Sequence, residues 1–212
     1  MGHLRRRWSE LPDTRKPNHN TKYSIADGVL SAFAVFFMQS GSFLAHQRLL
    51  EKKKGRNNAR SLSQVDEIPS DPQIRNLLDP LSSSNFGEDF WFLLDSLKAQ
   101  GCLMQFRCAL NTYAIAMDGV NFFSSEKISC PKCLKREDRN GTEHFYHSAI
   151  TPVFVKPGQR QVLSLPAEFI VPQAGNEKQD CERVAAKRWL SQYQQHFDDH
   201  SVTYLGEDLY AN

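Results

Sequence analysis

The apolar residues of this chain change their spacing near residue 110. Before that point they recur at helical intervals, and after it they form short runs bounded by turn residues. A long apolar stretch from Ser24 to about Lys54 predicts two helices or one broken helix, with Gly41 as the break. The cations before Gly55 and the glycine itself are typical of a helix end. Residues 56–70 are therefore predicted to be a linker.

Two more helices are expected before the change of spacing. Ser70 or Asp71 can cap the first of them, with Pro72 in the first turn. Ile74, Leu77 and Leu78 would form its buried stripe. The second runs from about residue 85 to 99 and is expected to bury Phe86, Phe90, Leu93, Leu94 and Leu97. Residues 23–110 thus predict an all-helical module, preceded by a polar, basic, flexible tail at residues 1–22.

The second half of the chain predicts strands and one helix. Strands are expected at 112–117, 145–155, 161–165 and 202–205, with an amphipathic helix that reaches Tyr193 before the last strand. This order is a meander followed by a crossover helix onto a fourth strand, which would place the first and fourth strands side by side. We therefore predict a mixed α/β (α+β) fold, with residues 111–212 as the second domain.

Charge is distributed unevenly along the chain. Residues 1–60 hold twelve Lys/Arg and four Asp/Glu, a net charge of +8, whereas the whole chain is at +2. A basic front end on an acidic body fits a polyanionic partner, nucleic acid first; a solvated basic tail without a partner is the alternative. The candidate DNA-binding residues are Arg5, Arg6, Arg7, Lys52, Lys53 and Lys54.

The cysteines and the longest apolar run indicate the compartment. Five cysteines are an odd set with no secretory signal before them, which favours a reducing, cytoplasmic compartment with free thiols or a metal site. The apolar run at residues 29–38 has about ten residues, whereas a membrane span needs about 20. We expect no membrane association.

Acidic residues stand at the ends of two predicted strands. Asp118 follows the first strand, and Glu207 and Asp208 follow the fourth. If these strands are neighbours, the carboxylates converge and can hold Mg²⁺, which prefers oxygen ligands and phosphate substrates. Strand-ending Asp-Gly is also a very common turn, so Asp118 alone would be weak evidence.

Several motifs resemble one protein family. They are Ile115–Gly119, Pro166–Ile170, Lys178–Glu182, Ala186–Leu190 and Leu205–Tyr210, and they are similar to motifs of bacterial insertion-sequence transposases with a ribonuclease-H-like DDE core. The resemblance covers about residues 23–212. It implies an incomplete ribonuclease-H-like sheet, Mg²⁺ as catalytic ion, Asp118 as first metal-binding acid and Glu207 or Asp208 as the second.

The same resemblance implies a binding partner and an incomplete set of catalytic acids. The DNA of the element's ends would be the partner, and a homo-oligomer is compatible with this. Relatives carry the third acid on a later helix, so the resemblance implies that the sequence given is the truncated N-terminal part, which binds DNA without cutting it. The rival interpretation is a non-catalytic DNA- or zinc-binding interaction protein.

A cysteine and histidine pattern forms a further candidate site. Cys130, Cys133, His144 and His147 give C-x2-C-x10-H-x2-H, with Asn140-Gly141 as a hairpin signal between the halves. A structural zinc ion is one interpretation, and reduced thiols with surface histidines are the other. If residues 144–147 are strand, the two imidazoles point to opposite faces and only one can be a ligand.

Overall fold

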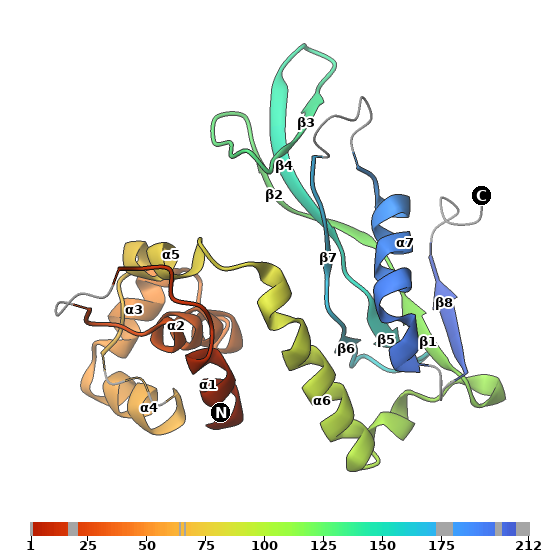
Figure 1. Cartoon of the computed structure of the whole chain (residues 1–212), viewed down its shortest axis with the longest axis horizontal. Coiled ribbons are helices and arrows are strands. Elements are labelled where there is room, and N and C mark those ends of the chain that lie inside the picture. Colours follow the sequence, from red (N-terminus) through yellow and green to blue (C-terminus); the bar gives the residue numbers. More distant parts are fainter. Residues whose placement is uncertain are drawn as a thin grey trace. The chain divides into compact units, whose positions relative to one another are not determined.

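The chain consists of two compact units, residues 1–85 and 86–212 (Figure 1). The structure is a computed structural model, which describes residues 2–16, 21–63, 65, 67–172, 180–197 and 201–206. Helices come first and mixed sheets with one further helix follow, as in a mixed α+β fold, so the predicted fold class is confirmed. Within the described residues, no helix has both the length and the apolar character that a bilayer span requires.

The first unit is a set of helices gathered around α2 (Figure 1). Its helices are α1 (Gly2–Ser9), α2 (Ile25–Phe37), α3 (Phe43–Leu50), α4 (Lys53–Ser63) and α5 (Asp71–Leu78). Ser24 caps α2, because its hydroxyl accepts from Asp27 N–H while Asp27 accepts from Ser24 N–H, at 3.1 and 3.0 Å. The predicted start of α5 is confirmed, with Ser70 as N-cap and Pro72 in the first turn.

Two helices of this unit lie where the sequence analysis expects a tail and a linker. In the segment expected to be a flexible tail, α1 packs on α2 through Trp8, which is buried and lies 5.9 Å from the ring of Phe33. In the expected linker, α4 runs through Gly55 rather than ending there. The helix α4 was not predicted because its buried positions include small residues, Gly55 and Ala59, which give almost no apolar periodicity.

The second unit begins with α6 (Gly87–Ala99), which follows a 3-10 turn at Ser83–Phe86. The sequence analysis groups this helix with the helical module. In the structure its Trp91 and Leu94 join the core of the second unit, together with Trp189 and Phe197. Leu93 is 47 % exposed, so its predicted burial is wrong. Trp91, two residues earlier in the helix, is buried instead.

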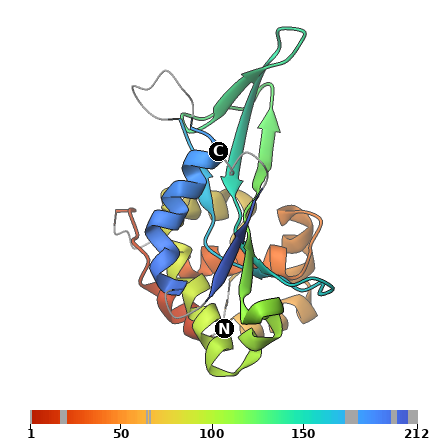
Figure 2. The same cartoon turned by 90° about the vertical axis from the view of Figure 1, so that its right-hand side faces the viewer.

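Two sheets make up the rest of the second unit. The strands are β1 (Tyr113–Ala116), β2 (Gly119–Ser125), β3 (Leu134–Glu137), β4 (Glu143–Ile150), β5 (Val153–Val155), β6 (Leu163–Ser164), β7 (Glu168–Ile170) and β8 (Val202–Leu205), with α7 (Glu182–Tyr193) before the last. One sheet has the order β6-β5-β1-β8; in the other, β4 pairs with β2, β3 and β7. As expected, β8 lies beside β1 and is parallel to it (Figure 2).

The strand predicted at 145–155 is broken into β4 and β5. The break falls at Thr151 and Pro152, where proline has no N–H to donate to a ladder. A single register nevertheless spans both halves, because Ala116 pairs with Val153 and Gly119 with Ile150. Between these pairs, Thr151 N–H donates to the Asp118 carbonyl oxygen at 3.0 Å. The chain therefore builds one long, bent antiparallel pair, with β1 and β5 at one end and β2 and β4 at the other.

A half-buried ion-pair network connects α7 to the sheet. Arg188 on α7 donates to both carboxylate oxygens of Asp180, at 3.0 and 2.8 Å, and to Glu168 of β7 at 2.8 Å. These contacts raise the pKa of Arg188, first through its hydrogen bonds to Asp180. One residue further, the Trp189 ring N–H donates to the Pro166 carbonyl oxygen at 2.7 Å in the core. Three of the motifs noted in the sequence thus meet at one place.

We expect Arg188→Ala to destabilise the chain by about 3 kcal/mol. The Asp180 side chain is 0 % exposed and would lose its charge partner, while the 34 % exposure of Arg188 keeps the cost at the lower end of values for buried pairs. Urea unfolding followed by tryptophan fluorescence measures this change in the free energy of unfolding. Lys187→Ala, on the exposed side of the same helix, is the control. Equal unfolding midpoints for the two variants would contradict the structural role of the network.

Candidate metal centre and the Asp118 strand end

Three potential metal ligands meet at the base of the β3–β4 hairpin. Cys130 and Cys133 lie in the turn before β3, and His147 lies on β4. The two sulfurs are 3.8 Å apart, and each lies 3.4 Å from His147 Nε2. Within the described residues this is the one cluster of at least three Cys, His, Asp or Glu side chains that could hold a metal ion.

The separations of these atoms match the edges of a metal tetrahedron. With metal–sulfur bonds of about 2.3 Å and metal–nitrogen bonds of about 2.0 Å, tetrahedral ligands stand about 3.8 Å apart for two sulfurs and about 3.5 Å apart for sulfur and nitrogen. All three distances agree with this geometry within about 0.2 Å, the tolerance expected of a metal site. Cys130 N–H also donates to Cys133 Sγ at 3.2 Å, which helps to hold the sulfur in this position.

His144, the fourth residue of the sequence pattern, is not part of the cluster. It stands three residues before His147 on β4, so its side chain leaves the opposite face of the strand. Its Nε2 instead lies 3.4 Å from Asp138 Oδ2. The Asn140-Gly141 turn is present, with Gly141 at a φ of 80°, and it returns β4 alongside β3. Of the two histidines in the sequence pattern, only His147 thus belongs to the cluster.

Two phenylalanines enclose the imidazole of His147. The register of β2 against β4 shifts between Asn121 and Phe123, a bulge that leaves Phe122 unpaired. Both rings then reach His147, with centroids at 5.7 Å for Phe122 and 5.5 Å for Phe123. Cys133 is buried and Cys130 is exposed, so the centre is apolar on one side and open on the other. The sequence analysis did not predict these two phenylalanines beside His147, because β2 was not predicted as a strand.

Asp118 stands where β1 and β8 end together. Met117 N–H donates to the Leu205 carbonyl oxygen at 2.8 Å, the last backbone contact between the two strands in the described part of the chain. The Asp118 side chain is exposed, and its Oδ1 accepts from Gly119 N–H at 2.7 Å. Glu207 and Asp208, the other predicted acids, lie outside the described residues.

Sequence reasoning missed Glu182 as a neighbour of this strand end. A Cβ atom on Gly119 would collide with the Glu182 carboxylate, so the first turn of α7 places an acid directly against Gly119. A larger residue at position 119 would displace the Glu182 carboxylate from this position. The signal in the sequence was the acidic residue near the start of a predicted crossover helix, since such helices return to the sheet at its strand ends.

The predicted DNA-binding cations belong to the helical unit. Arg5 on α1 is paired with Asp27 of α2 at 3.2 Å and so helps to hold the two helices together, whereas Arg6 is exposed and Arg7 is half-buried. Lys52 and Lys54 are exposed at the start of α4; the side chain of Lys53 lies outside the described residues.

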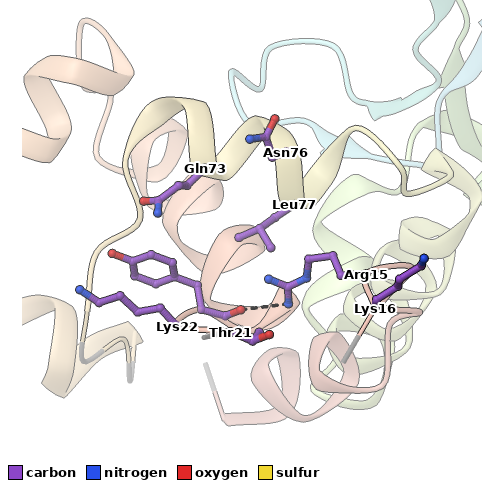
Figure 3. A pocket seen from close by; sticks show the side chains of 8 residues that line it. Arg15, Lys16, Thr21, Lys22, Gln73, Asn76 and Leu77 are labelled. Carbon is purple, nitrogen blue, oxygen red and sulfur yellow. Dashed lines mark hydrogen bonds between the residues drawn. The ribbon is translucent and has the colours of Figure 1, made fainter. Parts of the chain in front are cut away.

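A hollow in the helical unit carries further cations (Figure 3). It measures 320 Å³ and is lined by Arg15, Lys16, Lys22 and Tyr23 beside residues of α5. Arg15 donates to the Tyr23 carbonyl oxygen at 3.0 Å, the dashed line in Figure 3. It also forms two bonds to Asp13, at 2.8 and 2.6 Å, which raise the pKa of Arg15 and lower that of Asp13. The charge of Arg15 is therefore largely compensated.

Comparison of the chain with protein-family models, with curated proteins and with solved structures gave no match.

We expect the purified chain to hold about one metal ion at this centre, because its three ligand atoms already stand at tetrahedral separations. Metal analysis of protein prepared without chelator measures it. His147→Ala and Cys133→Ser should lose the ion, whereas His144→Ala should keep it. Equal metal content in the two histidine variants would contradict the assignment of His147.

Proposed function

We propose that this chain is a DNA-processing protein of the transposase type, in which Asp118 serves metal-dependent phosphoryl transfer. One observation carries the proposal. Asp118 lies at the common carboxyl end of two parallel neighbouring strands, β1 and β8, joined by a helix. In open sheets of this kind, ligands bind where the strands end.

The sheet order supports the same proposal. Three antiparallel strands, β6, β5 and β1, are followed by a parallel β8, with α7 as the crossover. This is the order that the ribonuclease-H-like resemblance implies. In the sequence, Glu207 follows Leu205 by two residues, as Asp118 follows Ala116, and Ala116 pairs with Leu205. Glu207 is thus the counterpart of Asp118 by position in the chain, with Asp208 next to it.

The donor atoms at this strand end fit Mg²⁺. Asp118 offers an exposed carboxylate, and Glu182 brings a second one against Gly119. Hard oxygen donors of this kind suit Mg²⁺, which in phosphoryl transfer would polarise the phosphate and stabilise the charge that develops on its oxygens. The chain's own part is to hold the acids: Gly119 N–H fixes one Asp118 oxygen, and the β1–β5 pairing fixes the backbone beneath it.

The Cys130/Cys133/His147 centre serves a different ion. Two thiolates and one imidazole are soft donors that select zinc over Mg²⁺. We assign it a structural zinc ion, which joins the turn before β3 to β4. The same centre favours the second candidate function, a zinc-dependent interaction protein without catalysis. The two candidates differ in whether Asp118 binds a metal ion.

Replacing Mg²⁺ with Fe²⁺ tests directly whether Asp118 binds a metal ion. With ascorbate and peroxide, bound Fe²⁺ cleaves nearby backbone, so we expect fragments that end near residues 118 and 205, where β1 and β8 meet. Asp118→Asn should abolish these fragments, because it removes the anionic ligand and preserves the shape of the side chain.

Asp95→Asn, an exposed position on α6, is the matched control and should leave the fragments unchanged. Fragments that persist in Asp118→Asn, or that arise only around residues 130–147, would contradict the proposed phosphoryl-transfer site and favour the zinc-dependent interaction protein.

A further inference from the structure

Cys130 and Cys133 stand at the two ends of one tight turn. Cys133 N–H donates to the Cys130 carbonyl oxygen at 3.0 Å, the hydrogen bond that closes a four-residue turn. In such a turn the first and last Cα atoms lie less than about 7 Å apart, and disulfides join Cα atoms about 4.4 to 6.8 Å apart. The two sulfurs already lie 3.8 Å from one another. Rotation of the two side chains can therefore close a disulfide of about 2.0 Å while the backbone keeps its place.

The two cysteines differ in their access to solvent. Cys130 is exposed, together with the residue on either side of it. Cys133 is buried, with 6 % of its surface exposed. A dissolved oxidant therefore reaches the Cys130 sulfur first. An accessible cysteine beside a second cysteine that can attack its oxidised form is typical of redox-sensitive proteins, and Cys130 and Cys133 have these two positions.

The other three cysteines have different surroundings. Cys102 and Cys108 lie between α6 and β1, where their sulfurs contact backbone carbonyl oxygens at 3.7 to 3.9 Å. Cys181 is exposed and lines a hollow with Tyr146. Because Tyr146 and His147 are neighbours in β4, their side chains leave opposite faces of the sheet. Cys181 therefore lies on the face away from the metal centre and provides a matched control thiol.

We propose that Cys130 is an oxidation site, at which a peroxide forms a disulfide between Cys130 and Cys133 and so releases the metal ion. The Cys130 thiolate attacks one peroxide oxygen, the O–O bond breaks, and a sulfenic acid and a hydroxide ion form. The Cys133 thiolate then attacks the Cys130 sulfur, the S–O bond breaks and a second hydroxide ion leaves. The two sulfurs together lose two electrons, which the peroxide takes up, and two protons from solvent convert the hydroxide ions to water.

Oxidation removes two of the three ligands of the centre. The anionic thiolate is the form of cysteine that binds a metal ion, and a disulfide sulfur carries no such charge. His147 alone is too few ligands for zinc, whose protein sites have three or four. The pairing of Leu134 with Tyr146 does not involve the sulfurs, so we expect β3 to stay beside β4. The release of zinc rests on the zinc assignment in the proposed function, whereas the disulfide rests on the sulfur geometry alone.

Hydrogen peroxide added to the full, zinc-loaded chain tests the proposal. Peptide mapping by mass spectrometry without reductant identifies the disulfide, and a chromogenic chelator measures the zinc in solution. We expect the Cys130–Cys133 disulfide and about one zinc ion released per disulfide, and a thiol reductant with added zinc should restore the centre. Cys181→Ser, the control at an exposed thiol on the other face, should give the same disulfide and the same release.

Three variants separate the sulfur chemistry from the metal ion. His147→Ala loses the imidazole ligand and keeps both cysteines, so peroxide should still form the disulfide. Cys133→Ser lacks the second thiol, so Cys130 should stop at the sulfenic acid, which a dimedone probe labels. In Cys130→Ser, the buried Cys133 should stay unlabelled. Circular dichroism of each variant confirms that the strands are retained, and the result on the unchanged chain decides the proposal where a variant unfolds.

The outcomes distinguish this proposal from the proposed function. A disulfide that joins Cys181, or peroxide treatment that leaves Cys130 and Cys133 unlinked in the unchanged chain, would overturn the oxidation site. Zinc that stays bound while the disulfide forms would overturn the release. A chain that binds no zinc and yet forms the disulfide supports the oxidation site and counts against the structural zinc ion. Asp118→Asn should be oxidised as the unchanged chain is, so the result stands even where the Fe²⁺ experiment fails.

Discussion

The long antiparallel pair formed by β1–β2 and β5–β4 determines the position of both candidate sites in the second unit. Its register passes through the break at Asp118 and Thr151, where one backbone hydrogen bond of 3.0 Å links the two chain segments. A shift by one residue would turn every side chain to the other face. Such a shift would break the backbone hydrogen bond between Thr151 and Asp118 and would move the Phe122 and Phe123 rings away from His147. The pair, with its register shift between Asn121 and Phe123, thus connects the strand end of Asp118 with the strand that carries His147.

The packing of α7 against the sheet positions a further residue at the strand end of Asp118. The helix is connected to the sheet by the charged contacts of Arg188 and by the buried Trp189 hydrogen bond to Pro166. These contacts fix the start of the helix, so that the Glu182 carboxylate meets Gly119. The motif residues around Asp180, Arg188 and Trp189 therefore have a structural explanation that does not depend on any activity.

The predictability of this chain from sequence follows from how each element is stabilised. α2, α5 and β8 were predictable because capping residues or apolar spacing mark them. In contrast, α4 has small buried residues, and in β2 the adjacent Phe122 and Phe123 interrupt the alternation of apolar and polar residues. For the metal centre, spacing alone identified the four candidates, and strand alternation limited the histidines to one. Only the β2 bulge, which no local sequence rule marks, decides that His147 is enclosed by two phenylalanines.

Under the proposed assignments, the separation of the two sites would keep their metal ions distinct. The thiolates of Cys130 and Cys133 would retain zinc, whereas the exposed carboxylate at the strand end would bind a weakly held, well-hydrated Mg²⁺. A shared site would let zinc displace Mg²⁺, since zinc binds most protein ligands more strongly. In that proposal, thiolates and imidazole at one end of the bent antiparallel pair, and carboxylates at its break, would let one chain hold both ions. A tightly held zinc ion would make the β3–β4 hairpin rigid, while the strand end would exchange its own ion with solvent and substrate phosphate.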